Sequence, residues 1–411
     1  MSHCIDIHCH PSLKVWLFDK SLRDTAKPPD DTELFDILNI DNVYVTIPRM
    51  EEGNVSMVWA SYYLPENKLI KSAKVSPFIK SLIIKGFKKQ VKRLENNKTP
   101  GTPFSQTKKM INKFQQEVLR SGGICPCSKS EMKNALSTNK RVFLQSMEGA
   151  HHLGTGYKIS NGKPDIEKYI HNIEYLFNKG ICSITLAHFF PNDLVSVVNG
   201  LPPNVTSLLN YPVSFPENGL SLVGQEVVKW MLEKGIIVDL IHSSPKTRKE
   251  IIGINKKANT KRPLVFSHCG TAEVFKAHAE KKHYKDYKLN PSNDEILAIK
   301  DCCGIIGLIF DLYWLRGKEE DNSIFGLIPD DKGITYLIET VRQIHRITGS
   351  YDNIAIGTDF DGFTDVIDDA PDISYLPKFR DALVKEGISL NNVDKIMGEN
   401  VLRVLEEGWG K

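Results

Sequence analysis

Eight short and nearly continuous apolar segments recur along this chain, and most of them alternate with segments of helical pattern. An apolar run without polar alternation is typical of a strand that is buried on both faces, as in a parallel sheet. Eight such strands suit a closed (β/α)8 barrel of the TIM type. The predicted strands span residues 4–10, 42–47, 141–147, 181–188, 236–242, 263–268, 304–310 and 353–359.

Helices are predicted between most of these strands from apolar residues at helical spacing. They span residues 30–39, 166–178, 219–234, 246–257, 294–301 and 334–348. An open, doubly wound sheet is the structural alternative. It is disfavoured because six of the eight strands end in a histidine or an acid: a barrel brings all strand ends to one rim, whereas an open sheet spreads them along a crevice.

The long segment at residues 49–135 interrupts this alternation. Residues 78–94 and 110–119 carry helical patterns within it. A chain of 411 residues could hold two or three domains by length alone, but α/β barrels often run long as one domain with insertions. We therefore predict a single TIM-barrel domain over residues 1–411, with a basic, mainly helical insertion at 49–135 after the second strand.

The net charge of +3 conceals a strongly basic stretch at residues 68–113, where thirteen lysines and arginines face one acid, Glu95. Such a stretch could meet a membrane surface, a nucleic acid or an acidic partner. No recognised nucleic-acid motif accompanies it, so a solvated helical surface is favoured and no nucleic-acid partner is expected. A docking role through residues 68–113 stays open as the weaker alternative.

The eight cysteines show no regular spacing, which favours buried thiols in a reducing cytosol over a disulfide framework or a zinc knuckle. No charged and apolar leader precedes His8, and no run of about twenty apolar residues is present. We therefore expect a cytoplasmic protein without a transmembrane anchor.

The first predicted strand carries His8 and His10, and Pro11 then ends it, because proline cannot donate to a ladder. Side chains alternate faces along a strand, so the two histidines point the same way and can close on one metal ion. Five further strands also end in a residue that can bind metal or transfer a proton. These residues are Glu148, His188, His242, His268 and Asp359.

Together these side chains predict a two-metal site. Imidazole and carboxylate suit zinc and related divalent ions, and the absence of cysteine from the strand ends argues against a structural thiolate site. Glu148 has two oxygens and is the best candidate for a bridging ligand. The expected assignment places His8, His10 and Asp359 on one ion, and His242 and His268 on the other.

The expected chemistry is hydrolysis. With two ions about 3.5–4 Å apart, a bridging water becomes hydroxide near neutral pH. Asp359 is then placed to accept the proton of that water and to return it to a leaving amine. His188, at the same rim, could polarise the scissile carbonyl or stabilise the tetrahedral oxyanion.

Several motifs in this order resemble the membrane (renal) dipeptidase family, peptidase family M19, a branch of the amidohydrolase superfamily of barrel metallohydrolases. The Gly-x-Asp-Phe-Asp-Gly and Gly-Glu-Asn-x-x-Arg-Val pieces are specific in combination, and the matches cover most of residues 140–405. They are MEGAH (147–151), LAH (186–188), GLSLVGQEVV (219–228), VDLIHS (238–243), PLVFSH (263–268), IGTDFDG (356–362) and MGENVLRV (397–404).

The resemblance implies a dipeptidase or related amide hydrolase with two zinc ions, and members often form homodimers. It implies that Glu148 bridges the ions and that His242 and His268 bind the second ion. It further implies that His188 contacts the substrate and that Asp359 transfers protons.

Two departures from the family pattern affect the expected substrate and metal. The family's first motif is His-x-Asp, but this chain has His10 in the third place, which removes one negative charge. The family also places an arginine against the dipeptide carboxylate, where the alignment puts Asn290. A neutral amide cannot make the bidentate, charge-assisted pair that arginine gives. Lys285, Lys288 or Arg316 could substitute for it.

Three functions therefore compete. The favoured one is a zinc-dependent dipeptidase-like hydrolase. The second is an amidohydrolase-type enzyme that acts on another small amide, an ester or a lactone. The third is a catalytically weak barrel that binds a partner through residues 68–113.

Overall fold

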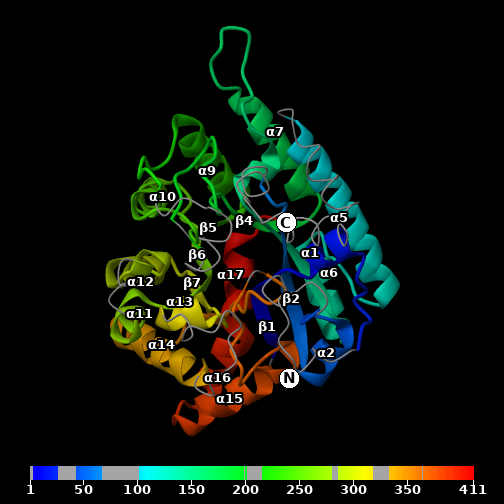
Figure 1. The fold of residues 1–411 in the computed structure, drawn as a ribbon, viewed down its shortest axis with the longest axis vertical. Helices are drawn as coiled ribbons and strands as arrows, with labels where there is room; N and C mark the ends of the chain where they lie inside the picture. The colour runs from blue at the N-terminus through cyan, green and yellow to red at the C-terminus, as the bar shows by residue number, and fades with distance from the viewer. Residues whose placement is uncertain are drawn as a thin grey trace, which may run out of the picture.

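The computed structural model describes residues 3–25, 43–66, 101–198, 200, 215–279, 286–317, 333–362 and 364–411. Eight parallel strands follow one another around a closed barrel in sequence order, and helices surround them (Figure 1). This confirms the predicted (β/α)8 fold. The strands are β1 (Cys4–Cys9), β2 (Val55–Tyr62), β3 (Val142–Glu148), β4 (Ile181–Thr185), β5 (Ile237–Asp239), β6 (Val265–Cys269), β7 (Ile305–Leu308) and β8 (Ile354–Ile356).

The barrel closes where β1 pairs with β8, through Asp6 and Ile356. The most regular ladder joins β2 to β3, from the pair Met57 and Val142 to the pair Tyr62 and Met147. All the strand residues are buried except Ser56, which is partly exposed. Their nearly continuous apolar character is thus the character expected of strands covered on both faces.

Helices begin with sequence signals that account for their positions. Ser221, Ser244 and Ser292 each accept a hydrogen bond from a main-chain N–H in the first turn, which is the usual N-cap arrangement. The α-helices are α1 (Pro11–Phe18), α2 (Ile47–Glu52), α5 (Thr102–Ser121), α6 (Lys129–Ser137), α7 (Ile166–Asn178), α9 (Leu222–Lys234), α10 (Pro245–Lys257), α11 (Ala272–His278), α12 (Asn293–Asp301), α13 (Leu312–Arg316), α14 (Gly333–Thr348), α15 (Leu376–Lys385), α16 (Leu390–Asp394) and α17 (Asn400–Gly408).

The predicted second strand at residues 42–47 is wrong. Residue 42 lies outside the described residues, residues 43–46 are not a strand, and α2 begins at Ile47. Thr46 caps this helix and Pro48 occupies its first turn, where a missing N–H costs nothing. The second strand of the barrel is β2, and the expected insertion, set to begin at residue 49, therefore contains a barrel strand.

The other predictions for this part of the chain have different outcomes. The helix expected at 110–119 is confirmed within the longer α5. The helices expected at 30–39 and 78–94 lie outside the described residues, as does most of the basic stretch at 68–113. The single-domain organisation and the bounds of an insertion stay predictions.

The remaining seven strands and five helices coincide with their predicted segments, but several strands end earlier than expected. His188, His242 and Asp359 each lie three residues beyond the last residue of β4, β5 and β8. These three predicted site residues thus sit on the first turns of the loops at the carboxyl rim, the face that carries the active site in barrels of this kind.

Two glycines show how closely β6, β7 and β8 approach one another. A β-carbon on Gly307 of β7 would lie 2.0 Å from the main-chain oxygen of Ser267, and one on Gly357, just after β8, would lie 1.8 Å from the same oxygen. Since the blocking atom is main chain, no side-chain rotation could relieve either clash. Glycine at both positions keeps β6, β7 and β8 in the register that carries His268 and Asp359.

Candidate metal centre

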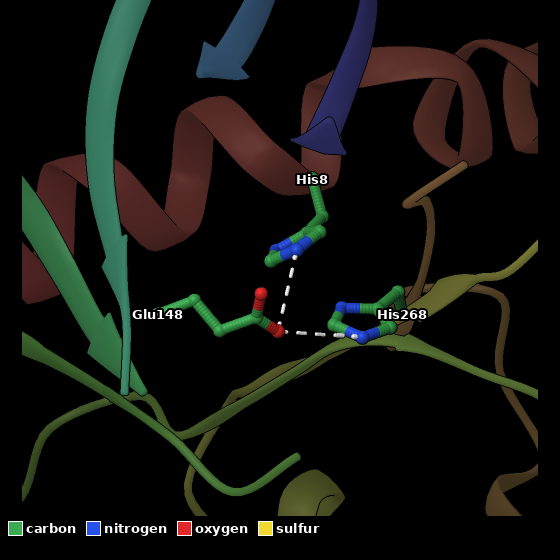
Figure 2. A group of neighbouring side chains, drawn as sticks. All are labelled: His8, Glu148 and His268. Carbon is green, nitrogen blue, oxygen red and sulfur yellow. Dashed lines mark ion pairs between the residues drawn. The ribbon is translucent and has the colours of Figure 1, made fainter. Parts of the chain in front are cut away.

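The seven histidines and acids predicted at the strand ends converge on one place. His8 comes from β1, Glu148 is the last residue of β3, and His268 belongs to β6. Figure 2 shows these three side chains pointing at one another from separate strands. All are nearly completely buried, with no more than 1% of any of them exposed.

The Glu148 carboxylate lies at the centre of the cluster, surrounded by five imidazoles. Its Oε1 is 3.2 Å from His242 Nε2 and 3.6 Å from Nε2 of both His8 and His268. Its Oε2 is 3.2 Å from His10 Nε2 and 3.4 Å from His188 Nε2. A carboxylate whose two oxygens each face several imidazole nitrogens has the geometry expected of a bridging ligand.

Asp359 joins the cluster from the turn after β8. Its Oδ1 lies 3.2 Å from His10 Nε2 and 3.7 Å from His8 Nε2. Its side chain is 16% exposed, more than the histidines that it faces. The backbone of Asp359 is left-handed (φ 61°), as is that of His242 (φ 59°). This conformation is uncommon for residues other than glycine, and such strain gathers at functional sites.

Three groups of side chains bring their ligand atoms within 4.8 Å of one another and could each hold an ion. One group, His8 with His10 and Asp359, matches the predicted ligands of the first ion. The other two differ from prediction, because His268 groups with His8 and Glu148, while His242 groups with His188 and Glu148. The assignment of particular ligands to particular ions stays a prediction.

The charges of the cluster shift its pKa values in opposite directions. Burial alone would raise the pKa of Glu148, but the surrounding histidines hold it well below its usual range. Burial lowers the pKa of His268 and of His188. Burial would also lower the pKa of His10, but hydrogen bonds and charges from Asp359 and Glu148 raise it to about 10.

Two buried acids tie the strands together beneath the cluster. Asp6 Oδ1 accepts hydrogen bonds from the main-chain N–H groups of His8 (3.1 Å) and Thr358 (3.0 Å), and Oδ2 accepts from the Thr358 hydroxyl at 2.6 Å. Burial raises the pKa of Asp6 to about 6. Asp239 likewise accepts from the Ser267 N–H at 3.1 Å. These bonds fix the main chain at His8 and next to Asp359 and His268, three of the predicted ligands.

A cavity opens over the cluster, and its wall includes His10, Glu148, His188, His242 and Asp359. Aromatic rings complete its lining: Tyr63, Phe189 and Trp314. The Trp314 ring centroid lies 5.3 Å from that of His242 and 5.7 Å from that of His268. A small substrate placed over the carboxylate would therefore contact apolar rings on its sides.

The sequence analysis missed Tyr63, Glu66 and Trp314. Glu66 lies 3.1 Å from His188 Nδ1 and accepts a hydrogen bond from the Tyr63 hydroxyl at 2.7 Å. Burial would raise the pKa of Glu66, but His151, His188 and the Tyr63 hydroxyl hold it at about 2. A correct placement of β2 would have put Tyr63 at a strand end. Trp314 follows β7, whose end carries no histidine to draw attention to it.

Asn290, the predicted contact for a substrate carboxylate, lies beside this site with its side chain engaged by main chain. Its Oδ1 accepts from the Gly270 N–H at 2.7 Å, and its Nδ2 donates to the Trp314 oxygen at 2.8 Å. Of the cations that could replace it, Lys288 pairs with Glu217 at 2.7 Å, and residue 285 lies outside the described residues. The role of Asn290 in substrate binding stays a prediction.

A closed barrel whose parallel strands bring histidines and carboxylates to one rim defines the class: (β/α)8 proteins with a candidate metal centre at the carboxyl ends of their strands. A family model for membrane dipeptidase (peptidase family M19) matches residues 2–408. The chain therefore belongs to this family, as the sequence motifs predicted.

Individual relatives are more distant. The chain is 26% identical over 262 residues to an uncharacterized dipeptidase of Schizosaccharomyces pombe, an alignment that covers 64% of this chain and 52% of that protein. It is 28% identical over 270 residues to dipeptidase tcpJ of Claviceps purpurea, covering 66% and 52% of the two chains. The matched part thus spans about half the length of these curated relatives.

The barrel is also similar to solved structures. One is a metallopeptidase from Rhodobacter sphaeroides, crystallised with a phosphinate mimic of the dipeptide L-Ala-D-Ala. It superposes with a TM-score of 0.65 at 18% sequence identity, over 99% of both chains. At this identity the similarity supports the fold.

Proposed function

We propose that this chain is a metal-dependent, dipeptidase-like hydrolase that cleaves a dipeptide or another small amide. The observation that carries the proposal is the Glu148 carboxylate, with five imidazole nitrogens within 3.6 Å of its oxygens and Asp359 beside them. Membership of the membrane dipeptidase family supports the same reaction.

The residues fit a pair of divalent cations. His8 Nε2 lies 3.0 Å from His10 Nε2, and His242 Nε2 lies 3.2 Å from His268 Nε2. Neutral imidazoles that face each other this closely need a proton or a cation between their lone pairs. Nitrogen and carboxylate ligands without cysteine suit zinc, so we propose two zinc ions. When bound, they supply an acidified water as nucleophile and a Lewis acid for the scissile carbonyl.

In this proposal one side chain transfers the proton and another stabilises the negative charge that develops on the substrate. Asp359 is the more exposed of the two acids in the cluster, so it can receive the proton of the attacking water and return it to the leaving amine. His188 lines the cavity and, as an imidazolium with a proton on each ring nitrogen, donates from Nε2 to the carbonyl oxygen as negative charge develops there. Glu148 is buried between the histidines and serves as the bridge.

The substrate class follows from the cavity wall. Tyr63, Phe189 and Trp314 offer apolar faces to the substrate side chains. An enzyme that acts on a different small amide, an ester or a lactone is the second candidate. It is favoured by one observation: Asn290 stands where the family's carboxylate-binding arginine is expected, and main chain occupies its amide.

The cellular setting and partners are also proposals. All eight cysteines are free thiols in this structure, which supports the predicted cytoplasmic location. In the described part of the chain, no helix is both long and apolar enough to cross a membrane. A homodimer, a small-molecule partner and the absence of nucleic-acid binding stay predictions, as does the weaker alternative of docking through residues 68–113.

The first test combines elemental analysis of protein purified without added metal with turnover of a mixed dipeptide panel. About two zinc ions per chain together with dipeptide cleavage is the expected result. Two ions without dipeptide cleavage, but with cleavage of an ester, a lactone or a C-terminal amide, would select the second candidate. A metal-free protein that stays inactive after zinc is added would contradict both.

A further inference from the structure

Glu66 forms a pair with His188 that the predicted reaction does not include. It lies four residues after β2, on a segment far from His188 in sequence, and only 6% of it is exposed. Its Oε1 is 3.1 Å from His188 Nδ1, and the Tyr63 hydroxyl donates to its Oε2 at 2.7 Å. Both oxygens of this buried carboxylate therefore have a defined partner.

The pair controls which nitrogen of His188 faces the cavity. A carboxylate oxygen accepts hydrogen bonds, so the imidazole proton in this contact belongs on Nδ1. The opposite nitrogen, Nε2, then points at Glu148, 3.4 Å from its Oε2. Without Glu66, rotation of the ring could exchange the two nitrogens, because the edges of an imidazole are similar in shape.

The segment that carries Glu66 is itself anchored to the turn after Glu148. The Leu64 N–H donates to His152 Nε2 at 2.7 Å, and the Leu64 oxygen lies 2.5 Å from His151 Nε2. His152 is held from its other side by the Thr107 hydroxyl, 2.8 Å from Nδ1. The carboxylate is thus fixed to the same turn that positions the bridging ligand.

We propose that Glu66 is a positioning residue for His188, holding its proton on Nδ1 and directing Nε2 into the cavity. The kinetic part of this inference rests on the proposed function, whereas the placement of the proton does not. Carboxylates that orient active-site histidines in this way commonly contribute about 10–100-fold to activity or metal affinity.

The test compares three variants with the zinc-loaded wild-type protein. Glu66→Ala removes the acceptor, and Glu66→Gln keeps an oxygen that can face Nδ1 while its amide group faces the Tyr63 hydroxyl. Glu117→Gln is the matched control, because Glu117 is also a buried carboxylate, 5% exposed, and accepts hydrogen bonds from the Leu22 N–H and the Ser121 hydroxyl on α5.

The first measurement is the ring ¹⁵N spectrum of histidine-labelled protein, with the His188 signals assigned by their loss in His188→Asn. The wild type should carry a proton on Nδ1 of His188, and Glu66→Gln should keep it there. Glu66→Ala should lose this preference. A wild-type ring protonated on Nε2 alone, or an unchanged spectrum in Glu66→Ala, would overturn the proposal.

The second measurement is dipeptide kinetics, with thermal melting to confirm folding. Glu66→Ala should lower kcat about 10–100-fold with little change in KM, and Glu66→Gln should recover most of this loss. Glu117→Gln should stay within about twofold of wild type. Equal losses in Glu66→Ala and Glu117→Gln would contradict a positioning role. If the wild type cleaves no dipeptide, the proposed function fails while the spectra still test the pair.

Discussion

The Nε2 atoms of His8 and His10 face each other at 3.0 Å where β1 meets α1. Two neutral rings cannot both direct a lone pair into this gap, so one nitrogen must carry a proton when no cation is present. Glu148 and Asp359 each lie 3.2 Å from His10 Nε2. Burial lowers the pKa of His10, but the hydrogen bonds and charges of these two acids outweigh burial and raise the pKa to about 10. The proton on His10 thus stands where a metal ion would bind.

Metal binding should therefore release a proton from His10. Since the pKa of His10 is raised to about 10, the proton is held throughout the neutral range, and a metal must displace it. Apparent metal affinity should rise with pH between about 7 and 9, by roughly tenfold per unit for one displaced proton. Competition with a chromophoric chelator at each pH measures this slope.

Two variants show whether the proton comes from His10. His10→Asn removes the titrating ring and should flatten the dependence of affinity on pH. His278→Gln is the control, because His278 pairs with Glu339 on the outside of the barrel, 2.5 Å away, and its removal should leave the slope unchanged. An affinity independent of pH in the wild type would show that no proton is displaced.

The proposed bridging role of Glu148 predicts a severe loss of activity in Glu148→Gln. The amide keeps the size of the side chain but removes the charge and one acceptor oxygen, so it cannot serve two cations at once. We expect kcat to fall by at least about 10³-fold, equivalent to about 4 kcal/mol of activation free energy, and the metal content to fall below that of the wild type. Kinetics and elemental analysis of the same preparation measure both.

Full activity with two bound ions in Glu148→Gln would remove the central argument for the site. The variant Glu117→Gln again serves as control, since it neutralises a buried carboxylate on α5. Melting temperatures of both variants separate a loss of chemistry from a loss of folding.

Much of this site could be predicted because it depends on strand ends. β3 and β6 are buried, mainly apolar strands; β3 ends at Glu148 and β6 carries His268 near its end, so their positions and their shared rim followed from parallel-sheet geometry. Closure of the barrel alone was enough to predict that residues from separate strands would meet. Their hydrogen-bond partners depend on tertiary packing that periodicity does not report.

The failure at the second strand shows the limit of apolar runs as a signal. Residues 43–47 and Val55–Tyr62 are both apolar, and burial alone does not distinguish a strand from the start of a buried helix. Pro48 is compatible with the end of a strand, but proline equally suits the first turn of a helix. This error concealed Tyr63 and Glu66, which follow the true strand.

The contacts among the predicted ligands are richer than the sequence pattern specifies. The sequence predicts His242 and His268 on one ion, and the structure brings their Nε2 atoms to 3.2 Å, but it also groups His242 with His188 and His268 with His8 around Glu148. Which nitrogen of each ring faces Glu148 depends on side-chain rotation. That rotation is set by contacts such as the one between the Ser267 hydroxyl and His268 Nδ1, at 2.9 Å.

Asp359→Asn should separate proton transfer from folding. Asparagine tolerates the left-handed backbone of this position (φ 61°) and keeps one oxygen toward His10, but it cannot accept a proton. We expect kcat to fall by about 10²–10⁴-fold, the range for loss of a general base, while KM changes little. Steady-state kinetics at pH 7 measure the two constants.

Asp361→Asn is the matched control for this change. Asp361 lies in the same turn with a left-handed backbone (φ 66°), but its carboxylate accepts from the main-chain N–H groups of Tyr44 and Val45. Replacing this carboxylate with an amide should lower the melting temperature and leave kcat within about threefold of wild type. Equal effects of the two substitutions on kcat would argue that Asp359 serves the turn and not the reaction.

Asn290→Ala tests whether this residue binds a substrate carboxylate or supports the rim. Removing the side chain leaves the Gly270 N–H and the Trp314 oxygen without their partner in a buried position. Because each of the two unsatisfied groups costs about 1–3 kcal/mol, we expect the free energy of unfolding to fall by roughly 2–6 kcal/mol. Urea denaturation measures it. The ratio of kcat/KM for a dipeptide to that for its C-terminal amide should stay the same.

Asn255→Ala provides the comparison, because Asn255 makes the same kind of main-chain bridge on α10. It donates to the Arg262 oxygen at 2.9 Å and accepts from the Arg262 N–H at 3.1 Å. A similar loss of stability in both variants, with an unchanged substrate ratio, would assign Asn290 to the support of Gly270 and Trp314. A rise in KM confined to the substrate with a free carboxylate would instead assign it to substrate binding, because only that substrate carries the charge that the amide would contact.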